Sequence, residues 1–143
     1  MSRVSRWLRV HSDIQAITTR RRENFLFLRD HLCGLSRVTL LHGDLPDSVC
    51  PWVFPIFLND VPCAHLRLQD EGIPAVNWGG VRPPTVNSAA FPDADFLYDN
   101  LIFLPIHQDL TRGNLDSIIR GIQRVVAAAR QREREVSKFS GMT

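Results

Sequence analysis

The sequence is nearly devoid of lysine. Of its 17 lysine and arginine residues, only Lys138 is a lysine. Arginine binds carboxylates and phosphates well, but it stays protonated and does not form a Schiff base. A reaction that proceeds through a lysine nucleophile must therefore use Lys138 or take its lysine from another polypeptide segment.

Cysteine is also scarce, and the three residues Cys33, Cys50 and Cys63 have no CxxC spacing. This number and spacing predict neither a disulfide framework nor a zinc site, and they favour a reducing compartment, the cytoplasm. The N-terminal segment 1–11 has no continuous apolar stretch of the kind found in secretory signals. Every apolar run is too short to span a bilayer, so we expect a cytoplasmic protein without a membrane partner.

Local motifs of common active sites are absent as well. The sequence contains no GxxxxGK[ST], GxGxxG, HExxH or GxSxG motif, so it gives no local support to a P-loop or serine-hydrolase site. Its five histidines include no pair at i, i+4, the spacing that places two metal ligands on one helical face. The net charge of +2 is close to neutral and does not predict binding to nucleic acid. We therefore predict no independent catalytic residue and no metal site.

What the sequence does contain is the pattern of one α+β domain, an α/β sandwich of helices and short strands. Apolar residues make up 44% of the chain, enough for one core. The expected elements, in order, are a helix over 12–34, strands over 38–41 and 52–58, a helix over 59–72, a strand over 73–78, a loop over 79–88, a short helix or irregular stretch over 91–100, a strand over 101–106 and a helix over 114–129.

Four expectations concern particular residues. The run Arg20–Arg22 with Glu23 is predicted to form a solvated helix face with a local ion pair. Pro55 is expected to place part of its strand at a sheet edge or in a bulge. Asn114 is expected to cap the final helix, and residues 134–143 are expected to form a charged, flexible tail.

A first candidate site lies where the strand over 73–78 ends. There Asn77 and Trp78 precede two glycines, an arrangement suited to the wall of a small-molecule site. The structural alternative, that Trp78 only packs over the core while the glycines make a turn, stays open.

A second candidate site follows the strand over 101–106. The chain there presents His107, Gln108 and Asp109 just before the final helix, and the titration range of histidine suits contact with a phosphate or hydroxyl. The alternative is that His107 and Asp109 help to cap the helix start.

The order of these segments resembles one enzyme family. "GIPA", then a tryptophan, then "LPIHQDL" is similar to the C-terminal part of the DegT/StrS family of pyridoxal-phosphate (PLP) sugar aminotransferases. Further pieces match in order over residues 12–130: Arg20–Asn24 resembles the "RR.N" helix that leaves the large domain, Cys50–Ile56 resembles the aromatic-rich "P..FP" strand, and the final helix resembles the family's last one.

The resemblance implies a C-terminal small domain of a fold-type-I PLP enzyme, with a small, mostly antiparallel sheet flanked by helices over residues 12–133. Members of the family are cytoplasmic homodimers that transfer an amino group from glutamate or glutamine to a keto-sugar, often nucleotide-linked. Trp78 and His107 match positions that can face the substrate, and Asn77 and Gln108 are second choices.

The family's lysine, pyridine-nitrogen carboxylate and phosphate cup lie on the large domain, upstream of the matched region. Lys138 falls in the predicted tail, so we expect no PLP to bind this chain alone and no aminotransferase activity from it. The implied partners are the missing large domain or a homodimer partner, together with a keto-sugar substrate. The alternative is a free-standing, non-catalytic α+β module used for binding or regulation.

Overall fold

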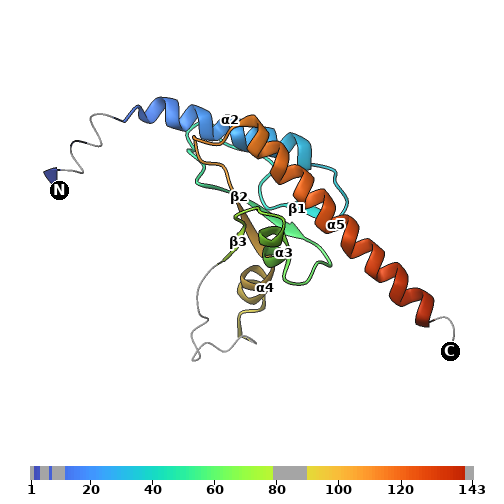
Figure 1. Ribbon diagram of the computed structural model, residues 1–143. Coiled ribbons are helices and arrows are strands. Elements are labelled where there is room, and N and C mark those ends of the chain that lie inside the picture. The colour runs from blue at the N-terminus through green and yellow to red at the C-terminus, as the bar shows by residue number, and fades with distance from the viewer. Residues whose placement is uncertain (1, 4–6, 8–11, 79–89, 141–143) are drawn as a thin grey trace.

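The computed structural model describes residues 2–3, 7, 12–78 and 90–140, with side chains through residue 135. The loop predicted over 79–88 and most of the segment 1–11 lie outside the described residues. The elements, in chain order (Figure 1), are α2 (Ile14–Leu32), β1 (Val38–Leu40), β2 (Val53–Leu58), α3 (Ala64–Asp70), β3 (Val76–Asn77), α4 (Pro92–Asn100), β4 (Leu101–Pro105) and α5 (Arg112–Ser140).

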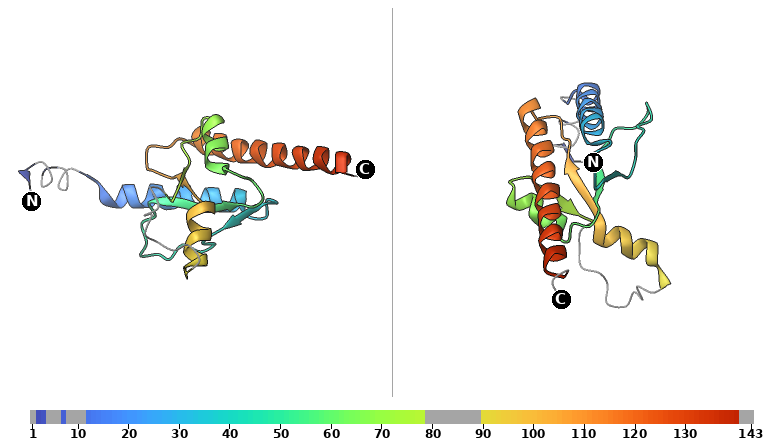
Figure 2. Two further views of the ribbon diagram at one scale, coloured as in Figure 1. Left: turned by 90° about the horizontal axis from the view of Figure 1, so that it is seen from below. Right: turned by 90° about the vertical axis from the view of Figure 1, so that its right-hand side faces the viewer.

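The four strands form one antiparallel sheet in the order β1-β2-β4-β3. Helices α3 and α5 lie on one side of this sheet and α4 lies on the other (Figure 2). On the α4 side, the ring of Phe96 lies 5.6 Å from the ring of Phe57 in β2. The predicted α+β class, with a small antiparallel sheet flanked by helices, is confirmed.

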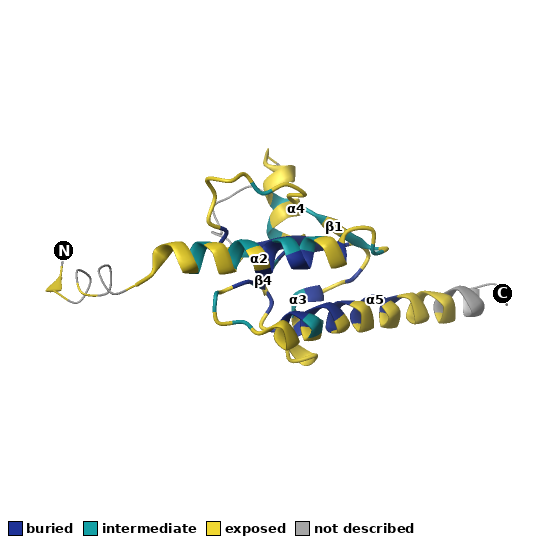
Figure 3. Cartoon of the chain, turned by 90° about the horizontal axis from the view of Figure 1, so that it is seen from above, coloured by how far each residue is buried: buried dark blue, intermediate teal, exposed yellow. Residues whose placement is uncertain are grey.

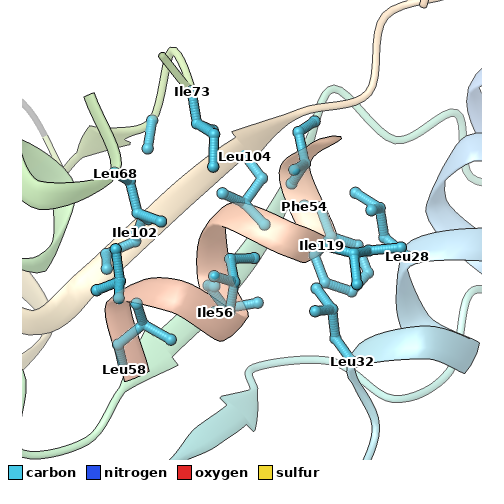
Figure 4. Packing of buried hydrophobic residues seen from close by; sticks show 14 of the residues in the cluster. Leu28, Leu32, Phe54, Ile56, Leu58, Leu68, Ile73, Ile102, Leu104 and Ile119 are labelled. Atoms are coloured by element: carbon cyan, nitrogen blue, oxygen red, sulfur yellow. The ribbon is translucent and has the colours of Figure 1, made fainter. Parts of the chain in front are cut away.

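The core follows from the two-residue alternation of β2 and β4. Phe54 and Ile56 of β2 and Leu104 of β4 are fully buried on the face toward α2, α3 and α5. Figure 4 shows these side chains meeting Leu28 of α2 and Ile119 of α5. The ring of Phe25 in α2 meets that of Phe54 at 4.7 Å, which fixes the helix against the middle of the sheet.

Polar side chains fix the starts of the two long helices. Asp13 caps α2, because its Oδ1 accepts a hydrogen bond of 2.9 Å from Ala16 N. At α5 the cap is Thr111 rather than the predicted Asn114. Thr111 Oγ1 accepts from Asn114 N at 3.2 Å, and Asn114 Oδ1 accepts from Thr111 N at 2.9 Å. Asn114 is thus the inner partner of a reciprocal capping box.

Helix α3 starts later than predicted. It begins at Ala64, after Cys63, whose φ of 52° lies in the left-handed region and cannot continue a helix from Pro62. Val61, Ala64 and Leu68 are buried as expected.

β2 is an interior strand, with β1 on one side and β4 on the other, but the part that contains Pro55 pairs with β4 alone and is locally an edge, as predicted. The carbonyl oxygen of Pro55 accepts from Leu41 N at 3.3 Å, so its backbone polar atoms face the β1 side. The ladder of β1 ends at Leu40, paired with Ile56. The missing N–H of Pro55 therefore falls just beyond β1, where the sheet tolerates it.

Helix α5 continues through the charged residues in which the sequence predicts a tail. Arginine and glutamate are good helix formers, so these residues extend the helix that the apolar stripe begins. Glu133 is also held by Arg37: Nη1 of Arg37 donates to Oε1 at 2.9 Å and Nη2 donates to Oε2. Lys138 lies in this last part of α5. The domain bounds 12–133 and the flexibility of residues 134–143 stay predictions.

Figure 3 shows that burial is confined to the middle of the molecule. The first turns of α2 contain no buried residue, residues 130–135 of α5 are exposed, and both segments project beyond the sheet. Across residues 12–78 and 90–140, no helix is both long and apolar enough to cross a membrane.

Candidate functional site

The second candidate site is a tight turn between β4 and α5, residues Ile106–Leu110, here called the His107 turn. Leu110 N donates to His107 O at 3.2 Å, which closes the turn. Ile106 is fully buried in the core, whereas the side chain of His107 is 48% exposed. The turn is thus anchored at its first residue and presents the histidine at its second.

Asn24 of α2 holds the main chain of this turn. Its side chain is buried, with 2% exposure, and it is the one polar residue among the buried residues described. Nδ2 donates to Ile106 O at 3.3 Å and to His107 O at 2.9 Å. A side-chain amide can be buried at low cost when its N–H groups have hydrogen-bond acceptors, as they do here.

Two neighbouring arginines of α2 also bind the turn. Arg21 Nε donates to Gln108 Oε1 at 3.1 Å, and Arg20 Nη2 reaches Leu110 O at 3.4 Å. The predicted local ion pair is present, with Arg20 Nη1 at 3.2 Å from Glu23 Oε2. The prediction of a solvated face is wrong for Arg21, because its guanidinium makes a tertiary contact with Gln108 and is partly buried.

Arg22 is likewise not a solvated residue. Its Nη1 donates to Pro46 O at 2.6 Å and to Val49 O at 2.7 Å, and its Nη2 lies 3.3 Å from Asp47 Oδ1. One guanidinium therefore fastens the loop before β2 onto α2. At the end of this loop Trp52 is 80% exposed.

Within the His107 turn, the polar side chains contact one another in a chain. Gln108 Nε2 donates to Asp109 Oδ2 at 3.0 Å, and the same oxygen lies 3.8 Å from His107 Nδ1. The cap of α5 comes from Thr111 and Asn114, so these contacts of His107 and Asp109 serve the turn and not the helix start.

The first candidate site lies at the opposite end of β4. Asn77 pairs with Ile102, five residues before His107. At about 3.4 Å per residue, the two candidate sites are roughly 17 Å apart along the strand. The structure therefore brings Asn77 next to Trp78 and His107 next to Gln108, but it does not bring these two pairs together.

Trp78 is 56% exposed, and its ring lies 5.6 Å from the ring of Phe103 in β4. It covers the sheet face opposite the core, together with Val76, which pairs with Phe103 and is 51% exposed. Phe96 of α4 is 55% exposed on the same side. We call these four residues the Trp78 face. Exposed apolar side chains grouped in this way are typical of an interaction surface.

The described hollows do not fit PLP. One of them, of about 320 Å³, is lined by Asp60, Cys63, His65 and Asp99 among others, and none of the three described hollows is lined by a lysine. In the described residues no group of histidine, cysteine and carboxylate side chains is placed to hold a metal ion. None of these described hollows thus offers the amine with which PLP forms a Schiff base.

A scan against protein-family models finds no match, and a search of curated proteins finds none either. Solved structures do match. The sugar aminotransferase CalS13 from Micromonospora echinospora is similar with a TM-score of 0.64 and 23% identity, over 78% of this chain and 31% of that one. The putative sugar aminotransferase Spr1654 from Streptococcus pneumoniae, in its PMP form, is similar with a TM-score of 0.71 and 17% identity, over 84% of this chain and 33% of that one.

A DegT DnrJ EryC1 StrS aminotransferase from Brucella abortus matches with a TM-score of 0.59 and 23% identity, over 75% of this chain and 30% of that one. The chain thus spans about a third of the length of the structures it matches. What it shares with them at these identities is the fold. The resemblance to part of a sugar aminotransferase, predicted from "GIPA" and "LPIHQDL", is confirmed at that level.

Proposed function

We propose that this chain is the C-terminal small-domain portion of a PLP-dependent sugar aminotransferase and closes one side of a substrate cleft against a larger, PLP-carrying domain. The observation that carries this proposal is a fold match to several sugar aminotransferases that covers most of this chain and only about a third of theirs. In the complete enzyme an amino group would pass from glutamate or glutamine to a keto-sugar. The free-standing module is not favoured by this match.

The Trp78 face supports the need for a partner. Trp78, Val76 and Phe96 are each more than half exposed, on a sheet side that α4 covers only in part. Burying apolar side chains of this size stabilises an interface by about 1.5–3 kcal/mol each at full burial. In the complete enzyme, a large domain or a homodimer partner would cover the part of this face that the ligand does not contact.

The separation of the two candidate sites suits an extended ligand. His107 and Gln108 lie at one end of β4, and Trp78 and Asn77 lie at the other. A nucleotide-linked sugar presents a charged diphosphate between a nucleoside and a sugar ring. We assign the histidine end to polar groups of such a ligand and Trp78 to an apolar ring face.

The first test uses the chain alone. When PLP is added, we expect no aldimine absorbance and no covalent adduct after borohydride reduction. An adduct at Lys138, identified by mass spectrometry of the tryptic peptides, would contradict the proposal. A Lys138→Arg variant serves as the matched control for non-specific labelling, because arginine keeps the charge but forms no Schiff base.

The second test restores a large domain. In a chimera, this chain replaces the matched third of one of the solved sugar aminotransferases. We expect the chimera to bind PLP and to aminate a keto-sugar, and His107→Ala to lower kcat/KM more than His42→Ala, an exposed histidine in the loop before β2. A folded, PLP-loaded chimera without amino transfer to any nucleotide-linked keto-sugar would refute the proposed function.

A further inference from the structure

We propose that Arg21 and Asn24 are positioning residues that aim His107 at its ligand, an inference that rests on the function proposed above for this histidine. Both residues lie on α2, more than 80 positions from the His107 turn in the sequence. They hold different parts of the turn, because Asn24 binds its main chain and Arg21 binds its side chains. Two separate supports therefore converge on one exposed imidazole.

The main-chain support acts on the two peptide groups next to the Cα atom of His107. Asn24 Nδ2 donates to the carbonyl oxygen before that atom, on Ile106, and to the carbonyl oxygen after it, on His107 itself. With both flanking carbonyls bound by one buried amide, the backbone dihedral angles of His107 have little freedom. The direction of its Cα–Cβ bond is thereby fixed relative to α2.

The side-chain support runs through Gln108. Arginine has only donors, so the oxygen of the Gln108 amide must face Arg21 Nε and its nitrogen must face Asp109. This orientation places Asp109 Oδ2 at 3.8 Å from His107 Nδ1. The carboxylate therefore lies on the Nδ1 side of the ring, beyond hydrogen-bond distance, and we assign Nε2 to the ligand.

Gln108 accordingly works inside this network. Both polar ends of its side chain are bound, at 3.1 Å to Arg21 and at 3.0 Å to Asp109. Its contribution to substrate binding is transmitted through Asp109 and His107. Without Arg21, the Gln108 side chain is held only by its hydrogen bond to Asp109, and its oxygen has lost its partner.

The experiment compares Arg21→Met with Arg29→Met in the isotopically labelled full chain by NMR. Methionine keeps the unbranched stem and the helix propensity of arginine but removes the donors. Arg29 is the matched control, because it lies on the same helix and its Nε bonds only to the adjacent Asp30. The readouts are the His107 ring signals, the Gln108 side-chain amide signals and the exchange rate of the Leu110 amide.

We expect Arg21→Met to shift the His107 and Gln108 signals and to raise exchange of the Leu110 amide by about tenfold, with β2 and β4 amides unchanged. Arg29→Met should leave all three readouts at their wild-type values. Arg21→Lys should cause smaller shifts and a smaller rise in exchange than Arg21→Met, because an ammonium group also donates to the Gln108 oxygen. Asn24→Asp, which replaces the donors by a carboxylate, should raise the exchange rate of the Leu110 amide more than Arg21→Met does.

Unchanged His107 and Leu110 signals in Arg21→Met would overturn the inference. Faster exchange spread evenly over all strands would overturn it too, because the residue would then only stabilise the fold. A separate titration of the wild-type chain with thymidine diphosphate glucose tests the function beneath it. If the His107 signals do not respond while the Arg21→Met effect is present, the proposed ligand contact fails and the turn-fixing network stands.

Discussion

Replacing Gly121 by alanine tests a close approach between α5 and the segment after α3. A Cβ at position 121 would lie 2.3 Å from Ile73 Cδ1 and 3.3 Å from Ile73 Cγ1. Ile73 is 3% exposed and belongs to the core, so its side chain cannot move away into solvent. Gly121 thus lets the buried face of α5 lie directly on the segment after α3.

Two effects of opposite sign set the result. Alanine in a helix interior is favoured over glycine by about 1 kcal/mol. Overpacking a well-filled core costs about 1–3 kcal/mol. Because the overlap involves a fully buried neighbour at 2.3 Å, we expect overpacking to dominate. The free energy of unfolding of Gly121→Ala should therefore fall by up to about 2 kcal/mol, the difference between these two effects.

A double-mutant cycle isolates the contact. Ile73→Val removes the Cδ1 atom and should cost about 0.5–1.5 kcal/mol by itself. In the Ile73→Val background, Gly121→Ala should be neutral or stabilising, which corresponds to a coupling energy of about 1–3 kcal/mol. The measurement is urea unfolding followed by circular dichroism at the helix band.

Gly113→Ala provides the control in the same helix. A Cβ there would meet only Thr111 Oγ1, at 3.8 Å, so the gain in helix propensity, up to about 1 kcal/mol, should stand alone. The reasoning is refuted if Gly121→Ala stabilises the protein as much as Gly113→Ala does. It is also refuted if Gly121→Ala has the same effect with Ile73 as with valine at that position.

Three further outcomes are expected. Thr111→Ala should lower the free energy of unfolding by about 1 kcal/mol, because it removes the cap of α5, and Thr111→Ser should restore most of it in urea unfolding. The guanidinium carbon of Arg112 lies 3.1 Å from the ring centroid of Phe27, so Arg112→Met should cost about 0.5–1 kcal/mol, and a smaller loss in a Phe27→Leu background would identify the cation–π contact. The hydrogen bond from Arg37 lowers the pKa of Glu133 below its ordinary value of 4.5. The pair therefore stabilises α5 above that pH and is lost as the pH falls through the lower folded pKa. Amide exchange around residue 133 should accelerate in that acidic range, whereas Glu133→Gln should abolish the pH dependence.

Most of the fold could be predicted from periodicity. The apolar stripe of α5 and the alternating residues of β4 each identify one element and its buried face. Details that depend on strand pairing could not be predicted. Pro55 is tolerated in the sheet because β1 ends at Leu40, and the sequence of one strand does not reveal where its neighbour ends.

The His107 turn was identified from the sequence, but what holds it was not. Arg21 interrupts the apolar stripe of α2, and Asn24 lies on the same side, four residues before the buried Leu28. Polar residues at buried helical positions are a usable signal of tertiary hydrogen bonds. Their partner, the His107 turn, is more than 80 residues away in the sequence. Residue spacing could therefore indicate that a buried polar contact exists, but it could not identify the partner.

The distance in sequence between the His107 turn and its supports also governs when the domain can assemble. Asn24 bonds to Ile106 and His107, which follow it by 82 and 83 positions. Arg37 bonds to Glu133, which follows it by 96 positions. Closing loops of that length must precede the contacts they bring together, which slows folding. During synthesis, the core-facing side chains of α2 can therefore pack only on β1 and β2 until β4 and α5 emerge. The early helix is the part of the nascent chain that a holdase would be expected to cover.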